Sequence, residues 1–224
     1  MSSIAESKEI TDHSRKIVLP RLYAILDASL FIAEGELLDA AARLVNAGVA
    51  LIQYRNKSGD AAAMLTQARE LRQKLLYVEG ARIPRLIMND RSDLCLAAEY
   101  DGVHVGQDDL SPESARKVVG ADRWVGVSTH NPEQVARADQ TSADYIATGP
   151  VFGTSSKANP DPVIGLEGVR QARARTRKPL VAIGGITRQN CRSVIDAGAD
   201  SVAVISDLLR DPAKSAEAFL RILG

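Results

Sequence analysis

The sequence predicts one parallel (β/α)8 barrel, spanning residues 21–224, behind a short polar extension of residues 1–20. Three observations lead to this prediction: eight short apolar runs recur along the chain, amphipathic segments separate them, and the turns between them are short. Strands that are apolar throughout are typical of a parallel sheet that is covered on both faces. An open Rossmann-like sheet is the alternative, but the residues after the first run, DASLFIAEG, lack the GxGxxG pattern.

The expected strands are short runs rich in β-branched and aliphatic residues. In chain order they are residues 22–26 (LYAIL), 49–54 (VALIQY), 85–89 (RLIMN), 102–105 (GVHV), 124–128 (WVGVS), 144–148 (DYIAT), 180–183 (LVAI) and 201–205 (SVAVI). Each is followed by a stretch long enough for a helix, as a repeated βα unit requires.

Helical segments are recognised by their periodicity and their caps. Within residues 60–77, apolar side chains recur on one face at helical spacing, and charged residues fall largely elsewhere. The pairs Ser111–Pro112 and Asn131–Pro132 each combine an N-cap residue with proline in the first helical position. The repeated Ala-Gly in 46–53 and 196–204 indicates a helix that ends and turns directly into a buried strand.

Composition narrows the class of protein. The chain contains 28 Lys and Arg against 28 Asp and Glu, so it has no net field that would attract nucleic acid or an anionic membrane. Neither cysteine lies in a CxxC or Cys/His pattern, which favours reduced thiols and a cytoplasmic location. Residues 1–20 contain no apolar run for a signal peptide or a membrane span, and we expect them to be mobile. The oligomeric state stays open, a homo-oligomer included.

Polar residues gather after the strands, at ends that a closed barrel brings to one mouth. Gln53 and Arg55 fall on the same side of the second strand, and Lys57 follows if the chain stays extended. Two cations and an amide at one strand end predict an anion site, although an exposed lead into the next helix would explain the same residues. Asp90 and Asp109 favour the site, because carboxylates beside cations fit a divalent ion such as Mg2+ that bridges them to phosphate oxygens.

A second group of anion-binding features follows the sixth strand. The loop of residues 149–157 combines glycines with hydroxyl groups and Lys157, which together can donate to phosphate oxygens. After the seventh strand, the pair Gly184–Gly185 exposes backbone N–H groups ahead of a helix expected near Thr187. Ser206 follows the eighth strand, and loops after strands seven and eight are the recurrent phosphate site of this barrel.

Two histidines lie near the predicted mouth. His104 alternates with two valines, which favours a buried, hydrogen-bonded side chain over a catalytic one. His130 lies two residues after Ser128, and a direct role in proton transfer is one hypothesis for it.

Taken together, these residues resemble the thiamine phosphate synthase family. The resemblance rests on seven motifs in order: QYRNK (53–57), ND (89–90), DGVHVGQDD (101–109), GVSTH (126–130), GPVFGTSSK (149–157), IGGI (183–186) and VIS (204–206). It implies a TIM barrel that joins hydroxymethylpyrimidine diphosphate to a thiazole phosphate in the presence of Mg2+ and releases pyrophosphate.

The resemblance also implies roles for individual residues. The pyrimidine diphosphate would be bound by Gln53, Arg55, Lys57, Asn89, Ser128 and Lys157, of which Ser128 and Lys157 would lie at the leaving group. Asp90 and Asp109 would hold Mg2+. The thiazole phosphate, carboxylated or not, would contact Thr154, Ser156, Gly185, Ile205 and Ser206.

Two other functions would suit parts of this pattern. A related thiazole tautomerase would give His130 a central acid/base role, and a catalytically silent barrel would bind a phosphate ligand as a sensor. A monophosphate sensor would not need Asp90, Asp109 and Lys157, and the full diphosphate and metal set argues against the tautomerase. The sequence therefore favours a synthase that acts on two small phosphorylated substrates.

Overall fold

Eight parallel strands close into a barrel in the computed structural model, which describes residues 17–33, 35–154 and 161–224. The strands pair in chain order, and the last returns to the first, where Val202 lies opposite Leu22. They are β1 (Leu22–Asp27), β2 (Leu51–Arg55), β3 (Arg85–Asn89), β4 (Gly102–Val105), β5 (Trp124–Thr129), β6 (Tyr145–Thr148), β7 (Leu180–Ile183) and β8 (Ser201–Val204). The predicted (β/α)8 barrel is confirmed, and every predicted strand occurs within two residues of its expected ends.

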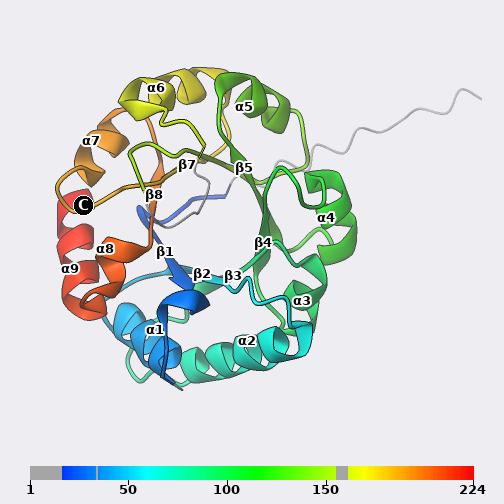
Figure 1. The fold of residues 1–224 in the computed structure, drawn as a ribbon, viewed down its shortest axis with the longest axis vertical. Helices are drawn as coiled ribbons and strands as arrows, with labels where there is room; N and C mark the ends of the chain where they lie inside the picture. Colours follow the sequence, from blue (N-terminus) through cyan, green and yellow to red (C-terminus); the bar gives the residue numbers. More distant parts are fainter. Residues whose placement is uncertain (1–16, 34, 155–160) are drawn as a thin grey trace, which may run out of the picture.

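Helices follow the strands and form an outer ring around the barrel (Figure 1). In the described part of the chain they are α1 (Glu36–Asn46), α2 (Ala61–Leu76), α3 (Ser92–Ala97), α4 (Pro112–Val119), α5 (Pro132–Asp139), α6 (Gly165–Arg175), α7 (Cys191–Asp196), α8 (Ser206–Leu209) and α9 (Pro212–Leu223), with the 3-10 helix η1 (Ala28–Leu30) after β1. These crossovers return each strand in parallel to its neighbour. Over the ranges that the structure describes, every helix is too short or too polar to span a lipid bilayer.

Capping side chains explain where three of the helices begin. The carboxylate of Asp60 accepts the backbone N–H groups of Ala62 and Ala63, each at 3.0 Å, and so caps the start of α2. The predicted caps of α4 and α5 are confirmed, because Ser111 and Asn131 each accept the backbone N–H three residues further on, at 3.2 and 2.9 Å. Proline occupies the first position of both helices, where an amide hydrogen is not needed.

The helix expected near Thr187 begins later than the sequence predicted, at Cys191. A turn occupies the residues between them, because the side chain of Asn190 accepts the N–H of Thr187 at 2.8 Å. The amide of Asn190 also donates to the carbonyl of Gly185 at 3.1 Å. The Asn190 side chain, which has both a donor and an acceptor, therefore holds the loop in a turn, and α7 starts only after it.

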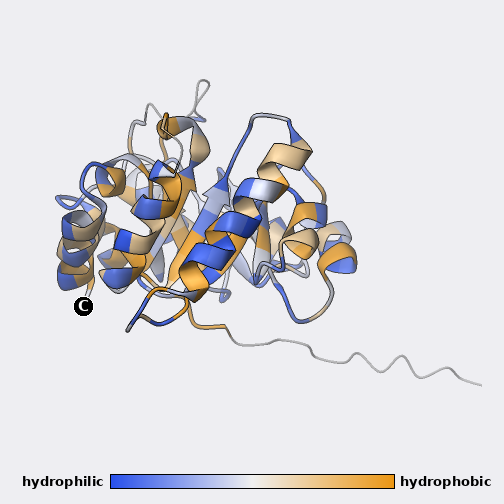
Figure 2. Ribbon diagram, turned by 90° about the horizontal axis from the view of Figure 1, so that it is seen from below, coloured by the Kyte–Doolittle hydropathy of each residue, from blue (hydrophilic) through white to orange (hydrophobic). Residues whose placement is uncertain are grey.

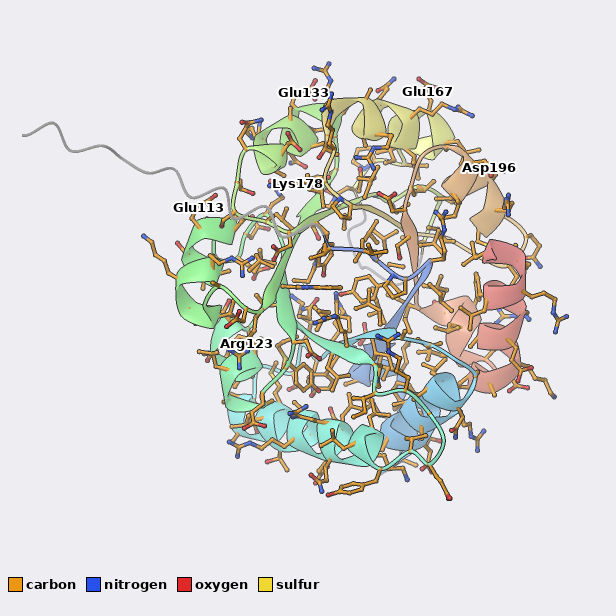
Figure 3. All side chains as sticks on the ribbon, turned by 180° about the vertical axis from the view of Figure 1, so that it is seen from behind. Glu113, Arg123, Glu133, Glu167, Lys178 and Asp196 are labelled. Atoms are coloured by element: carbon orange, nitrogen blue, oxygen red, sulfur yellow. The ribbon has the colours of Figure 1, made fainter. Side chains whose placement is uncertain are left out.

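Two apolar clusters stabilise the barrel. The larger lies between the strands and the surrounding helices, which present hydrophilic residues outward (Figure 2). The smaller includes Tyr23, Ile87 and Trp124 inside the barrel, together with Ile17 and Leu19 from the segment before β1. Side chains fill the interior, whereas charged residues such as those labelled on α5, α6 and α7 lie on the outer ring (Figure 3). Buried Ile17 and Leu19 at the end of the predicted extension therefore close the barrel at the amino ends of its strands.

Gly126 in β5 lies where the interior has no space for a side chain. The rings of His104 and Tyr145 stack beside it, with centroids 5.5 Å apart and planes inclined by 30°. A Cβ atom on Gly126 would collide with both side chains. The packing, rather than the backbone conformation, therefore requires glycine here.

We expect Gly126→Ala to lower the free energy of unfolding by about 1–3 kcal/mol, the usual cost of overpacking a core. Urea denaturation followed by circular dichroism measures this change. Gly153→Ala is the matched control, because a Cβ atom on Gly153 would meet no described atom within 4 Å. Equal stability of the two variants would contradict this account of the interior.

Candidate functional site

The carboxyl ends of the strands form one mouth, where most of the predicted site residues lie. The structure places Gln53 and Arg55 in β2, Lys57 after it, Asn89 at the end of β3, Asp90 after it, Asp109 after β4 and Ser128 in β5. Ser156 and Lys157 lie outside the described residues. The fold thus brings together residues that are up to about 75 positions apart in the chain.

Both predicted cations at the end of β2 are paired with carboxylates. The guanidinium of Arg55 donates to Asp27 at the end of β1, and the ammonium of Lys57 donates to Asp90. Asp27 is buried and also accepts the backbone N–H and the hydroxyl of Ser29, at 3.1 and 2.7 Å. Sequence reasoning missed Asp27, and a carboxylate directly after the first predicted strand was the available signal.

Asp90 is held in an unusual conformation beside a second carboxylate. Its φ of 60° lies in the left-handed region, and its backbone N–H donates to the carbonyl of His104 at 2.7 Å. Burial raises the pKa of the Asp90 carboxyl, Lys57 opposes the rise, and Asp109 adds to it. Asp90 and Asp109 are therefore close enough to repel one another, and a cation between them would relieve that repulsion.

The amide nitrogen of Asn89, the residue that ends β3 directly before Asp90, is a further polar group at this strand end. It is buried and has no hydrogen-bond partner among the described residues. A buried N–H group without an acceptor is unfavourable, so this position favours a ligand that supplies an oxygen.

The two carboxylates fit only part of a metal site. Within the described ranges, no group of three or more His, Cys, Asp or Glu side chains could hold a metal ion. Mg2+ commonly takes one or two protein carboxylates and completes its coordination with water and phosphate oxygens. Asp90 and Asp109 match that arrangement in number and in chemistry.

Ser128 and Gln53 are connected through the barrel interior. The hydroxyl of Ser128 lies 2.9 Å from Nε2 of His104, whose Nδ1 lies 3.1 Å from the hydroxyl of Tyr145. Tyr145 contacts the hydroxyl of Tyr23, which accepts from Nε2 of Gln53 at 2.8 Å. Burial lowers the pKa of His104 to about 4, so its imidazole is neutral at neutral pH. The prediction that His104 is buried and hydrogen-bonded is confirmed.

A pocket of about 370 Å3 opens beside Ser128, between the ends of β5 to β8. Its wall includes Thr154, Gly185, Ile205 and Ser206, the described members of the set predicted to bind the thiazole phosphate. Ser128 of the predicted diphosphate set lines the same pocket. One residue of the predicted diphosphate set therefore shares a pocket with the described members of the predicted thiazole phosphate set.

Main-chain contacts between two loops form one side of this pocket. The N–H groups of Val151 and Phe152 after β6 donate to the carbonyls of Ile183 and Gly184 after β7, at 2.9 and 3.0 Å. Gly185 has a φ of 62°, and a Cβ atom there would lie 2.5 Å from the carbonyl oxygen of Gly153. Glycine is required at this position because the two backbones approach so closely.

An ion pair joins the loop after β7 to α8. Arg188 donates to Asp207 from its backbone N–H, from Nε and from one terminal nitrogen, each at 3.0 Å. Burial would raise the pKa of Asp207, but the hydrogen bonds from Arg188 outweigh it and hold that pKa below its usual value. Asp207 lines the pocket, so Arg188 compensates a negative charge in its wall. Sequence reasoning missed this pair, because nothing in the spacing of Arg188 and Asp207 indicates that they meet.

His130 also lines the pocket and is fixed to the loop after β6. Its Nδ1 lies 2.8 Å from the carbonyl of Gly149 and therefore carries a hydrogen, since a carbonyl only accepts. A carboxylate oxygen of Asp161 lies 3.5 Å from the same nitrogen. A direct role of His130 in proton transfer stays a prediction.

Comparisons with known proteins point to one family. A family model described as thiamine monophosphate synthase matches residues 22–208. The thiamine-phosphate synthase of Koribacter versatilis (strain Ellin345) is 59% identical over 208 residues, which are 92% of this chain and 96% of that protein. The thiamine-phosphate synthase of Shouchella clausii (strain KSM-K16) is 40% identical over 202 residues, which are 89% of this chain and 94% of that protein.

A solved structure gives the same result. The thiamine phosphate pyrophosphorylase from Pyrococcus furiosus matches with a TM-score of 0.78 and 31% sequence identity, covering 91% of this chain and 95% of that chain. Together with the family model, whose range includes every residue of the mouth described above, this likeness extends over the whole barrel.

We expect Arg188→Gln to weaken the binding of inorganic phosphate by about tenfold, because it leaves the Asp207 carboxylate uncompensated in the pocket wall. The double variant Arg188→Gln/Asp207→Asn should recover most of the loss, since it removes both charges. Isothermal titration calorimetry measures each affinity. Arg192→Gln, which breaks the exposed pair of Arg192 with Asp196 on α7, is the control. A loss as large in Arg192→Gln as in Arg188→Gln would contradict the role of this pair.

Proposed function

The chain belongs to the thiamine monophosphate synthase family, and we propose that it condenses 4-amino-2-methyl-5-hydroxymethylpyrimidine diphosphate with 4-methyl-5-(2-hydroxyethyl)thiazole phosphate. The products are thiamine phosphate and pyrophosphate, and the thiazole is taken with or without its carboxylate. One observation carries this proposal: Ser128, which we assign to the diphosphate leaving group, lines the same pocket as Gly185 and Ser206 of the thiazole phosphate set. The paired Lys57 and Asp90 follow β2 and β3 at the same mouth. Two phosphorylated ligands in these positions would meet at Ser128.

The reaction is a substitution at the methylene carbon of the pyrimidine. The bond to the diphosphate oxygen breaks, the electron-rich aminopyrimidine stabilises the positive charge that develops, and the thiazole nitrogen supplies the electron pair of the new bond. Arg55, Lys57 and Lys157 would stabilise the negative charge on the departing pyrophosphate. No nucleophilic side chain is needed, and the alignment of two bound substrates would account for much of the acceleration.

Ser128 and Lys157 are the residues that we assign to the leaving group. The hydroxyl of Ser128 lies 2.9 Å from Nε2 of His104, and Ser128 lines the pocket. The amide nitrogen of Asn89, which has no hydrogen-bond partner in the described part of the chain, and the amide of Gln53 would hold the pyrimidine diphosphate. In the pocket, the hydroxyls of Thr154 and Ser206 and the backbone at Gly185 and Ile205 would bind the thiazole phosphate. We assign Ser156, which lies outside the described residues, to the same ligand.

We propose that Asp90 and Asp109 hold Mg2+. The mutual repulsion of these carboxylates supports a cation between them. When bound, Mg2+ would neutralise charge on the diphosphate oxygens. A ligand with a single phosphate would not require this group, so the carboxylates favour the synthase over a phosphate sensor.

Two further properties are predictions of the same proposal. Both cysteines are buried and unpaired, which supports a cytoplasmic location. We expect the partners to be the two small substrates, and neither nucleic acid nor a membrane. A homo-oligomer would be compatible with this function.

We expect the purified protein, mixed with both substrates and Mg2+, to release pyrophosphate, as measured by a coupled pyrophosphate assay. Removal of Mg2+ with EDTA should abolish the release, and Asp109→Ala should lower kcat by about 100-fold, because charge on the leaving group loses its compensation. Asp108→Ala is the control, since Asp108 is the neighbouring carboxylate, equally exposed, that we do not assign to the metal. No pyrophosphate from the wild type would refute the function, and equal rates for the two variants would refute the metal assignment.

We expect Lys157→Ala and Thr154→Val to impair different substrates. Loss of the ammonium group at 157 should chiefly raise KM for the pyrimidine diphosphate and lower kcat, whereas loss of the hydroxyl at 154 should chiefly raise KM for the thiazole phosphate. Steady-state kinetics with each substrate varied in turn measures both effects. Identical changes in both KM values for both variants would contradict this division.

A further inference from the structure

Five polar side chains form one hydrogen-bonded chain through the barrel interior. The chain runs from Gln53 in β2 through Tyr23 in β1, Tyr145 in β6 and His104 in β4 to Ser128 in β5. Its successive contacts measure 2.8, 3.1, 3.1 and 2.9 Å. The two ends are residues that we assign to the pyrimidine diphosphate, whereas the three residues between them have no assigned part in the reaction.

The first half of the chain has a definite direction, because each hydroxyl has a single hydrogen to donate. An amide nitrogen only donates, so the oxygen of Tyr23 accepts from Gln53. The other described partner of the Tyr23 hydroxyl is Tyr145, and Tyr23 therefore donates to it. The opposite direction would leave the hydroxyl hydrogen of Tyr23 unpaired at a fully buried site, which is costly.

The second half follows from the first. The hydroxyl of Tyr145 accepts from Tyr23 and donates to its remaining described partner, Nδ1 of His104. Because Nδ1 accepts from Tyr145, it carries no hydrogen, and the neutral ring has its single hydrogen on the other nitrogen. That hydrogen is on Nε2 and is donated to the oxygen of Ser128. The hydroxyl hydrogen of Ser128 is then directed elsewhere, and Ser128 lines the mouth.

We propose that Tyr23, Tyr145 and His104 are positioning residues that polarise the site through this chain. They hold Ser128 as a hydrogen-bond donor toward the ligand and Gln53 with its amide oxygen presented as an acceptor. The assignment of ligands to the two ends rests on the proposed function, whereas the direction of the chain does not.

The direction suits the chemistry at both ends. A hydroxyl that already accepts from His104 donates more strongly, because successive hydrogen bonds polarise one another. Ser128 can therefore donate to the diphosphate oxygen on which negative charge develops as the carbon–oxygen bond breaks. At the other end, the amide oxygen of Gln53 can accept from the amino group of an aminopyrimidine. A ring with a carbonyl group in that position has no hydrogen to donate and would bind less well.

The first test needs no substrate. The protein contains three histidines, so its 15N-histidine NMR spectrum at neutral pH has few signals. Comparison with the spectrum of His104→Gln identifies the signals of His104. We expect the hydrogen of His104 on Nε2 in the wild type. Tyr145→Phe removes the donor to Nδ1 and should leave a mixture of the two tautomers. Tyr100→Phe, which removes another buried tyrosine hydroxyl that donates to the carbonyl of Ala68, should leave the signals unchanged.

The second test uses kinetics. Tyr145→Phe should lower kcat for pyrophosphate release by about 10- to 100-fold, the size seen when an outer partner of a reacting group is lost, with KM for the thiazole phosphate unchanged. Tyr23→Phe should instead raise KM for the pyrimidine diphosphate, because it releases the amide of Gln53. Tyr100→Phe should keep both constants while losing comparable stability.

Three results would overturn the proposal. They are a hydrogen on Nδ1 of His104 in the wild type, a single unchanged tautomer in Tyr145→Phe, and a kcat for Tyr145→Phe equal to that of Tyr100→Phe. A wild type with the expected tautomer but no pyrophosphate release would refute the function alone and leave the direction of the chain standing.

Discussion

Closure of the sheet is the constraint on which the rest of the structure depends. Because β1 pairs with both β2 and β8, no strand edge stays open, and every strand delivers its carboxyl end to the same rim. Asp27 from the first strand can therefore pair with Arg55 from the second, while Ser128 and Ser206 border one pocket. None of these residues is close to its partner in sequence, and the barrel alone brings them together.

Charge at the mouth is arranged in opposed pairs. Three cations (Arg55, Lys57 and Arg188) each meet a carboxylate (Asp27, Asp90 and Asp207). Ion pairs that are partly open to water contribute little to stability. Their effect is geometric, because each pair restricts a long side chain that would otherwise sample many rotamers. Such preorganisation reduces the rearrangement that accompanies the binding of a charged ligand.

The architecture, and the strand ends from which the candidate site residues come, could be predicted from the sequence, because both depend on local patterns. Apolar runs identified the strands, proline behind Ser111 and Asn131 identified two helix starts, and alternation identified His104 as buried. What escaped prediction depends on side chains meeting across the fold. The pair of Arg188 with Asp207 and the contact between Tyr23 and Tyr145 have no local signal. The late start of α7 was not predicted for a related reason. The side chain of Asn190 hydrogen-bonds the backbone of Gly185 and Thr187 in the loop before the helix begins.

The loops after β6 and β7 hold together through backbone atoms, so this wall of the pocket depends little on which side chains the loops carry. A surface of that kind tolerates sequence drift. Residues between its glycines can change, and the cavity keeps its outline as long as Gly184 and Gly185 allow the two chains to approach. Selection could therefore alter the substrate preference of this half of the mouth by exchanging the side chains that project into it, without rebuilding the frame that supports them.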